Sequence, residues 1–162
     1  MKKITDPHFT TQIFTRSTAK LLHRTTFLMD KAAEKTLQDK VGIGLSQFLT
    51  LMQMSSGQHC QRELASALGV TPAAISRQVS NLIDQGFLQK IEHENDRRFE
   101  FLILSPAGKK TFAKATEVLE SEFSSRYAAL SVTDRRQIHD SLMKLMSCYE
   151  PDITKQARPP DK

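Results

Sequence analysis

The chain has 162 residues, of which 39% are apolar and 25% are charged, so it can bury the core of one domain with extensions. It contains no run of about 18 apolar residues, which excludes a membrane span formed by a hydrophobic helix. The formal net charge of +5 suits an anionic partner without requiring one. No apolar run follows the basic start of the chain, so we expect no secretory signal and a cytoplasmic protein.

The first part of the chain is predicted to be helical. Residues 8–38 contain no glycine or proline and carry apolar side chains at helical spacing, which predicts one long helix. Two glycines in the segment 41–44 should end it. We expect Ser46 to cap a second helix that stops at residues 55–57, and we expect a short third helix over residues 61–68.

A tight turn and a fourth helix follow. Gly69, Val70 and Thr71 form the expected turn. Thr71 can cap a helix with Pro72 at its first position, where the missing N–H costs nothing. Gly86 is predicted to end this helix.

The pattern then changes from a helical to a strand-like spacing. Residues 87–92 and 99–104 are rich in strand-forming side chains and are joined by a charged segment, which predicts a two-stranded hairpin. A Ser-Pro pair at 105–106 opens a further helix, and Ser131 begins the last one. The segment 150–162 is polar and contains prolines, so we expect a disordered tail.

Helix, turn, helix and hairpin in this order are the layout of a winged helix-turn-helix. The predicted fold is therefore mainly α with a small β-hairpin wing, and the winged domain spans residues 45–105. The apolar stripes on 8–40 and 106–149 exceed what one small winged domain can cover, so we expect dimerisation helices and a homodimer. An intramolecular bundle is the alternative.

The helix that begins at Pro72 has one aliphatic face and one small, polar face centred on Arg77. A helix with such a face can enter the major groove of double-stranded DNA. There Arg77 can donate two hydrogen bonds to guanine, and Asn81 or Gln78 can read adenine. Ser76 and the start of the helix suit phosphate groups.

An ordinary solvated surface is the alternative for this face. The preceding turn argues against it. Ala65 permits close packing of two crossing helices, Gly69 permits a tight turn, and Val70 and Ile75 can fill the angle between the helices. Four positions that match together favour the helix-turn-helix.

The hairpin tip carries Asp96, Arg97 and Arg98. Guanidinium groups there can reach the minor groove, whose negative potential favours them, and Asp96 is expected to pair with an arginine and orient it. A charged turn that only keeps the hairpin soluble is the alternative. The residues expected to contact DNA are Thr71, Ala73, Ser76, Arg77, Gln78, Ser80, Asn81, Lys90, Arg97 and Arg98.

Segments 62–71, 74–77 and 82–88, the Asp-Arg-Arg sequence at 96–98 and the Leu-Ser-Pro-Ala-Gly sequence at 104–108 resemble the MarR family. The resemblance implies a homodimer with intertwined terminal helices that binds a palindromic operator, with Arg97 in the minor groove. It also implies that a small phenolic or lipophilic compound, or in some members cysteine oxidation, releases the DNA. The chain departs from the family in having Lys90 where arginine is common, and lysine cannot make a bidentate contact.

Two interpretations of the sensing site remain open. His23, Phe27, Phe48 and Met52 can line a pocket for a small-molecule effector, or they can belong to the apolar core. Cys60 is a candidate redox sensor, and the alternative is a small, partly buried side chain.

Other classes of function have less support. The sequence contains no GxSxG, phosphate-loop or HExxH motif, which disfavours an enzyme, and its scattered histidines predict no metal site or other cofactor. A winged-helix protein-interaction module remains the alternative, although it would not need arginines where two DNA grooves would meet them. The predicted function is a dimeric, sequence-specific DNA-binding transcriptional regulator, a repressor that a ligand or oxidant releases.

Overall fold

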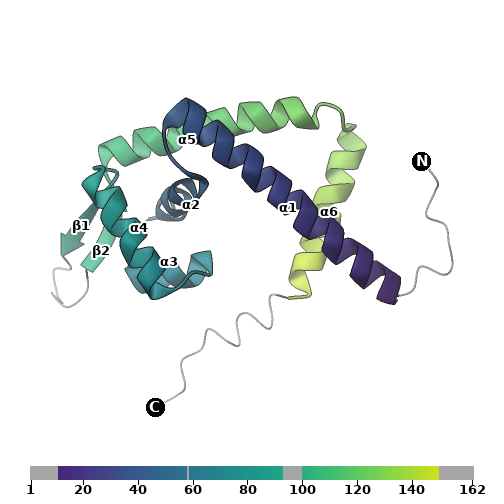
Figure 1. The fold of residues 1–162 in the computed structure, drawn as a ribbon, viewed down its shortest axis with the longest axis horizontal. Coiled ribbons are helices and arrows are strands. Elements are labelled where there is room, and N and C mark those ends of the chain that lie inside the picture. The colour runs from purple at the N-terminus through teal and green to yellow at the C-terminus, as the bar shows by residue number, and fades with distance from the viewer. Residues whose placement is uncertain (1–10, 58, 93–99, 150–162) are drawn as a thin grey trace, which may run out of the picture. The chain divides into compact units, whose positions relative to one another are not determined.

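The computed structural model describes residues 11–57, 59–92 and 100–149, and the chain divides into two units, residues 1–122 and 123–162. The described residues form helices and one antiparallel hairpin, which confirms the predicted fold class (Figure 1). None of their helices is long and apolar enough to cross a membrane. The elements are α1 (Thr11–Val41), α2 (Leu45–Met54), α3 (Gln61–Leu68), α4 (Pro72–Asp84), β1 (Leu88–Glu92), β2 (Glu100–Leu104), α5 (Pro106–Tyr127) and α6 (Val132–Ser147).

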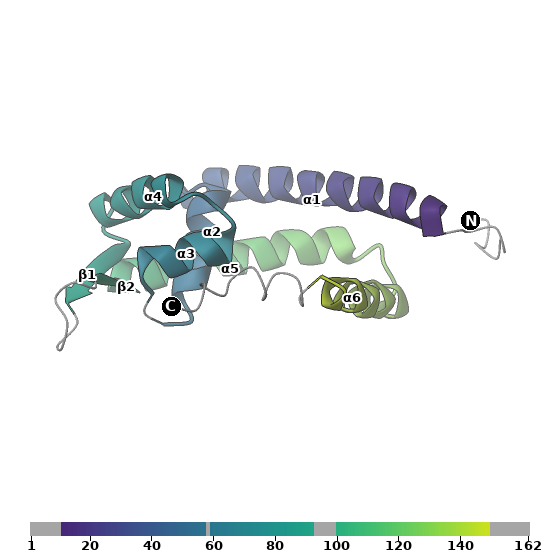
Figure 2. The same ribbon diagram turned by 90° about the horizontal axis from the view of Figure 1, so that it is seen from below.

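In the first unit, α2, α3, α4 and the hairpin lie together, as Figures 1 and 2 show. All of these elements contribute buried apolar side chains. The α1 helix leads away from this group. Among the α1 residues from 16 onward, only those near the C-terminal end of the helix are buried. Removal of these large side chains from water is the main favourable contribution to the fold. The largest fully buried side chains are those of Leu37, Thr50, Leu51, Met54, Leu64, Ile75, Val79, Leu82 and Leu102.

The start of α2 differs from the prediction. The N-cap is Gly44, so the expectation that Ser46 caps this helix is wrong. Two longer side chains satisfy the N–H groups at the helix start: Gln47 Oε1 accepts from Gly44 at 2.9 Å, and Glu34 of α1 accepts from Leu45 at 2.5 Å. The helix can therefore begin before the first hydroxyl side chain.

The hairpin pairs Leu88 with Leu104 and Lys90 with Leu102. Its second strand has a further partner outside the hairpin. The N–H of Leu102 donates to the carbonyl of His59 at 2.9 Å, and the N–H of His59 donates back at 3.2 Å. This bridge ties the segment before α3 to the base of the hairpin.

The start of α5 lies close to the backbone of the residues that follow α4. The Ser105 hydroxyl donates to the Gly86 carbonyl at 2.6 Å and accepts from the Gly108 N–H at 2.9 Å. A Cβ atom on Gly108 would lie 2.0 Å from the Phe87 carbonyl oxygen. Glycine is therefore required at this position by close backbone approach and not by an unusual φ angle.

The second unit contains the last turn of α5 and the whole of α6. The predicted capping box is confirmed, because Asp134 Oδ2 accepts from Ser131 N at 3.2 Å and Ser131 Oγ accepts from Asp134 N at 3.1 Å. The α6 helix buries none of its residues and exposes Ile138, Leu142 and other large apolar side chains.

Candidate nucleic-acid interface

The α4 helix is fixed at its start and along one face. Thr71 Oγ1 accepts from Ala74 N at 3.2 Å, and Pro72 occupies the first helical position, as predicted. On the core side, Ile75 and Val79 are buried. This packing determines which residues of α4 face outward.

The outward face is the one expected from the sequence. The exposed residues there are Ala73, Ser76, Arg77, Ser80 and Asn81. Three of them, Ala73, Ser76 and Ser80, have small side chains, and these surround Arg77. The Nε of Arg77 donates to the Ala73 carbonyl at 3.4 Å, a long contact within the same helix. A small face around one exposed guanidinium can approach a base edge closely.

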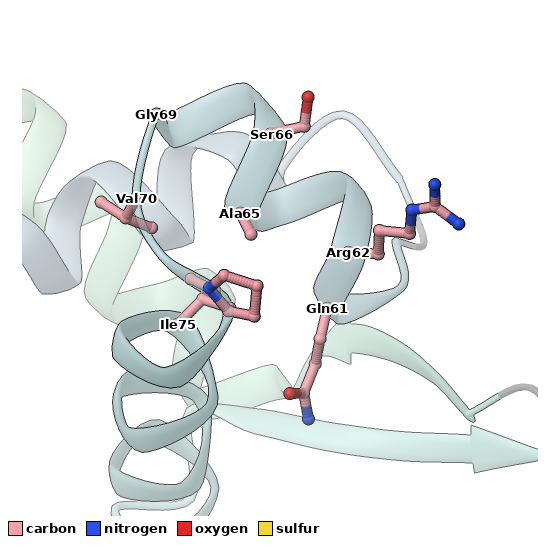
Figure 3. Close-up of a pocket in the computed structure, with 8 residues that line it drawn as sticks. Gln61, Arg62, Ala65, Ser66, Gly69, Val70 and Ile75 are labelled. Carbon is pink, nitrogen blue, oxygen red and sulfur yellow. The ribbon is translucent and has the colours of Figure 1, made fainter. Parts of the chain in front are cut away.

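The turn between α3 and α4 confirms three of the four predicted positions. Ala65 and Ile75 are buried, and Gly69 adopts a φ of 63° at the end of α3, a conformation that favours glycine. Val70 differs: its side chain is 39% exposed and does not fill the angle between the helices. It lines a surface hollow between α3 and the start of α4 (Figure 3).

Gln78 lies apart from the outward face. Its Nε2 donates to the Ser46 carbonyl and, at 2.6 Å, to the hydroxyl of Thr50, both on α2. These two contacts occupy both amide hydrogens, whereas reading adenine requires one of them. The structure thus gives Gln78 two hydrogen bonds within the protein.

A second glutamine, which the sequence reasoning missed, contacts α4 from α2, the helix that Gln78 also contacts. Gln47 Nε2 of α2 donates to Asn81 Oδ1 and to Gln85 Oε1, each at 2.9 Å. Gln78, Asn81 and Gln85 are three and four residues apart, so they form one stripe of amides along α4. This spacing is the feature of the sequence that could have revealed the amide stripe, because it places all three side chains between the apolar and the exposed face of α4.

The remaining predicted DNA contacts are on the hairpin. Lys90 lies on β1 with its side chain exposed. Asp96, Arg97 and Arg98 lie outside the described residues, as does the expected tail at 150–162.

The four residues expected at an effector pocket lie on two helices, His23 and Phe27 on α1 and Phe48 and Met52 on α2. Phe48 is buried and stacks on Phe112 with ring centroids 5.8 Å apart, which places it in the core. Met52 is exposed on α2. His23 and Phe27 line a shallow hollow on α1 together with Lys20 and Arg24.

Cys60 is a half-buried free thiol at the N-cap of α3. Its N–H donates to Glu63 Oε2 at 2.9 Å, so the glutamate caps the helix start.

The hydroxyl of Thr71 should contribute measurably to stability, because it satisfies one N–H at the start of α4. We expect Thr71→Ala to lower the free energy of unfolding by about 1 kcal/mol and Thr71→Ser to change it little. Urea titration at equal protein concentration measures both. An equal loss in the two variants would mean that the methyl group matters and not the cap.

Comparison with known sequences identifies a family. Residues 41–98 match the sequence profile described as MarR family. Over 112 residues, the chain is 30% identical to the HTH-type transcriptional regulator BilQ of Clostridium symbiosum (strain WAL-14163), an alignment that covers 68% of this chain and 78% of that protein.

Solved structures share the fold. Apo MarR from E. coli aligns with a TM-score of 0.72 at 19% identity, covering 78% of this chain and 94% of that one. A mutant of the same protein complexed with operator DNA aligns with a TM-score of 0.69 at 19% identity, covering 78% and 91%. BldR from Sulfolobus solfataricus aligns with a TM-score of 0.68 at 21% identity, covering 84% and 94%.

Proposed function

Because the chain belongs to the MarR family, we propose that it is a cytoplasmic transcriptional regulator that binds duplex DNA sequence-specifically, with α4 in the major groove. The observation that carries this proposal is the outward face of α4. Its small side chains surround one exposed arginine, and the capped helix start presents N–H groups for phosphate oxygens. A MarR mutant of the same fold has been solved with operator DNA.

The proposed contacts fall into two groups. Arg77 and Asn81 read base edges, whereas Thr71, Ser76 and Lys90 contact phosphate groups. Ala73 and Ser80 permit the close approach. The wing arginines, Arg97 and Arg98, enter the minor groove with Asp96 orienting them. Residues 45–105 form the DNA-binding domain in this proposal.

The active form in this proposal is a homodimer on a palindromic operator, built by helices within 8–40 and 106–149. Exposed apolar side chains, observed separately in each of the two units, support a partner chain. The α1 helix exposes Leu21, Phe27 and Leu28, with Leu21 at 66%, and α6 exposes a full row of large apolar side chains. Exposed apolar surface of this extent marks an interaction site.

The regulator acts as a repressor in this proposal, and an effector lowers its affinity for DNA. The hollow beside His23 and Phe27 combines an aromatic ring with the cations Lys20 and Arg24, which suits an aromatic anion. Oxidation of Cys60 is the second route, because its thiol is partly accessible at the start of α3.

Selection from a random pool of DNA duplexes tests the proposal. We expect the purified protein to enrich a palindrome whose half-sites are one helical turn, about 34–36 Å, apart. Affinity for the enriched duplex should fall roughly tenfold for each doubling of salt if ~4 phosphates are contacted. A pool with no enrichment at low and at moderate salt would contradict the proposal and favour a winged-helix protein-interaction module.

A further inference from the structure

The side chain of Gln47 on α2 makes three hydrogen bonds, one at the start of its own helix and two to α4 and its C-cap residue. Its Oε1 accepts from the backbone N–H of Gly44 at 2.9 Å. Its Nε2 donates to the side-chain oxygens of Asn81 and Gln85, each at 2.9 Å. A primary amide has two N–H donors, so both donors of Gln47 are used on α4.

These contacts determine how each amide is oriented. The nitrogen and oxygen of an amide side chain are often assigned only from their partners. Here one partner is a backbone N–H, which can only donate, so Gln47 must turn its oxygen toward Gly44 and its nitrogen toward α4. Asn81 must then turn its oxygen toward Gln47, which leaves its own NH₂ group on the exposed side.

The orientation of Asn81 decides which base edges it can recognise. Bidentate recognition of adenine uses the asparagine oxygen for the adenine N6 amino group and the asparagine nitrogen for N7. An Asn81 whose oxygen faces Gln47 presents N–H donors alone. In the major groove, the acceptors that match such a donor are guanine O6 and N7, adenine N7 and thymine O4, whereas cytosine presents only its N4 amino group.

We propose that Gln47 is a positioning residue for sequence readout: it holds Asn81 with its NH₂ group outward, so that Asn81 selects against cytosine at the base it faces. This inference rests on the proposed function, because it assumes that α4 lies in the major groove. It assigns part of the specificity to a residue on α2, which is not the reading helix.

The structure offers a substitution that reverses the orientation. In Gln47→Glu, a carboxylate oxygen still accepts from the Gly44 N–H, but the side chain has no donor for α4. Asn81 and Gln85 should therefore rotate their amides and turn the NH₂ groups inward. Asn81 then presents its oxygen, which matches the amino groups of cytosine and adenine.

The experiment compares the duplexes selected by the wild-type protein, Gln47→Glu and Asn81→Ala. Gln53→Glu, a neutral-to-acidic change on the same helix, is the charge-matched control. We expect wild-type protein to disfavour cytosine at one position of each half-site, and Asn81→Ala to lose that preference. Gln47→Glu should shift the same position toward cytosine by roughly 2–10-fold, the effect of one hydrogen bond. Gln53→Glu should weaken all duplexes alike.

A second measurement needs no DNA. In amide-exchange NMR of the free protein, we expect the side-chain NH₂ of Gln47 to be protected and that of Asn81 to exchange, and Gln47→Glu to protect the Asn81 NH₂. Unchanged base preference in Gln47→Glu, or a protected Asn81 NH₂ in the wild-type protein, would overturn the role of Gln47. A wild-type pool without any enriched duplex would instead overturn the proposed function, and with it this role.

Discussion

Replacing Gly108 with alanine should lower the free energy of unfolding by about 3 kcal/mol, at the upper end of what overpacking costs. The added methyl group would lie 2.0 Å from the Phe87 carbonyl oxygen, far inside van der Waals contact. The obstacle is backbone, so no side-chain rotation relieves it. Movement of α5 would stretch the Ser105 hydrogen bonds to Gly86 and Gly108, 2.6 and 2.9 Å long. Urea titration followed by circular dichroism measures the loss.

The control for Gly108 uses the opposite substitution at the neighbouring position. Ala107 is exposed, so Ala107→Gly changes only helix propensity and should destabilise by at most about 1 kcal/mol. Glycine is thus expected to be the worse residue at 107 and the better one at 108. A Gly108→Ala variant as stable as the wild-type protein would show that α5 does not approach Phe87 this closely.

Replacing Arg77 with alanine should cost about 1–3 kcal/mol of binding free energy on the best duplex, roughly 5–150-fold in affinity. The reason is the geometry of its guanidinium, which is exposed in the second turn of α4 and can bind guanine O6 and N7 together. Arg77→Lys keeps the charge but not the paired donors, so it should retain binding to random DNA and lose discrimination. Fluorescence anisotropy with the selected duplex and with random DNA measures both.

Lys114→Ala is the control for charge, because it removes one exposed positive charge from α5. We expect it to change affinity for both duplexes little. If Arg77→Ala weakened binding equally on the selected and the random duplex, Arg77 would be a phosphate contact and not a reader of sequence.

The sequence predicted well the features that depend on local chemistry. The cap at Thr71, the left-handed Gly69 and the capping box at Ser131 each depend on residues within four positions of one another. The outward face of α4 was predictable for a related reason, since helical periodicity alone determines which side chains oppose the apolar stripe.

The features that sequence did not predict depend on residues distant in the chain. Gln47 and Asn81 are 34 residues apart, and no local pattern says that their amides meet. Ser46 was expected to cap α2 because a hydroxyl there is a common cap, but Glu34 of α1 satisfies the helix start instead. The close approach at Gly108 also involves another segment, the backbone at Phe87, so helical spacing within α5 does not reveal it.

The exposed α6 helix has a consequence for how the protein folds. It is 16 residues long and buries none of them, and an isolated helix of about this length is marginal in water. Its helical state therefore depends on whatever covers its apolar row. If that cover is a second chain, coil-to-helix conversion and association are a single equilibrium, and the helicity of this segment rises with protein concentration.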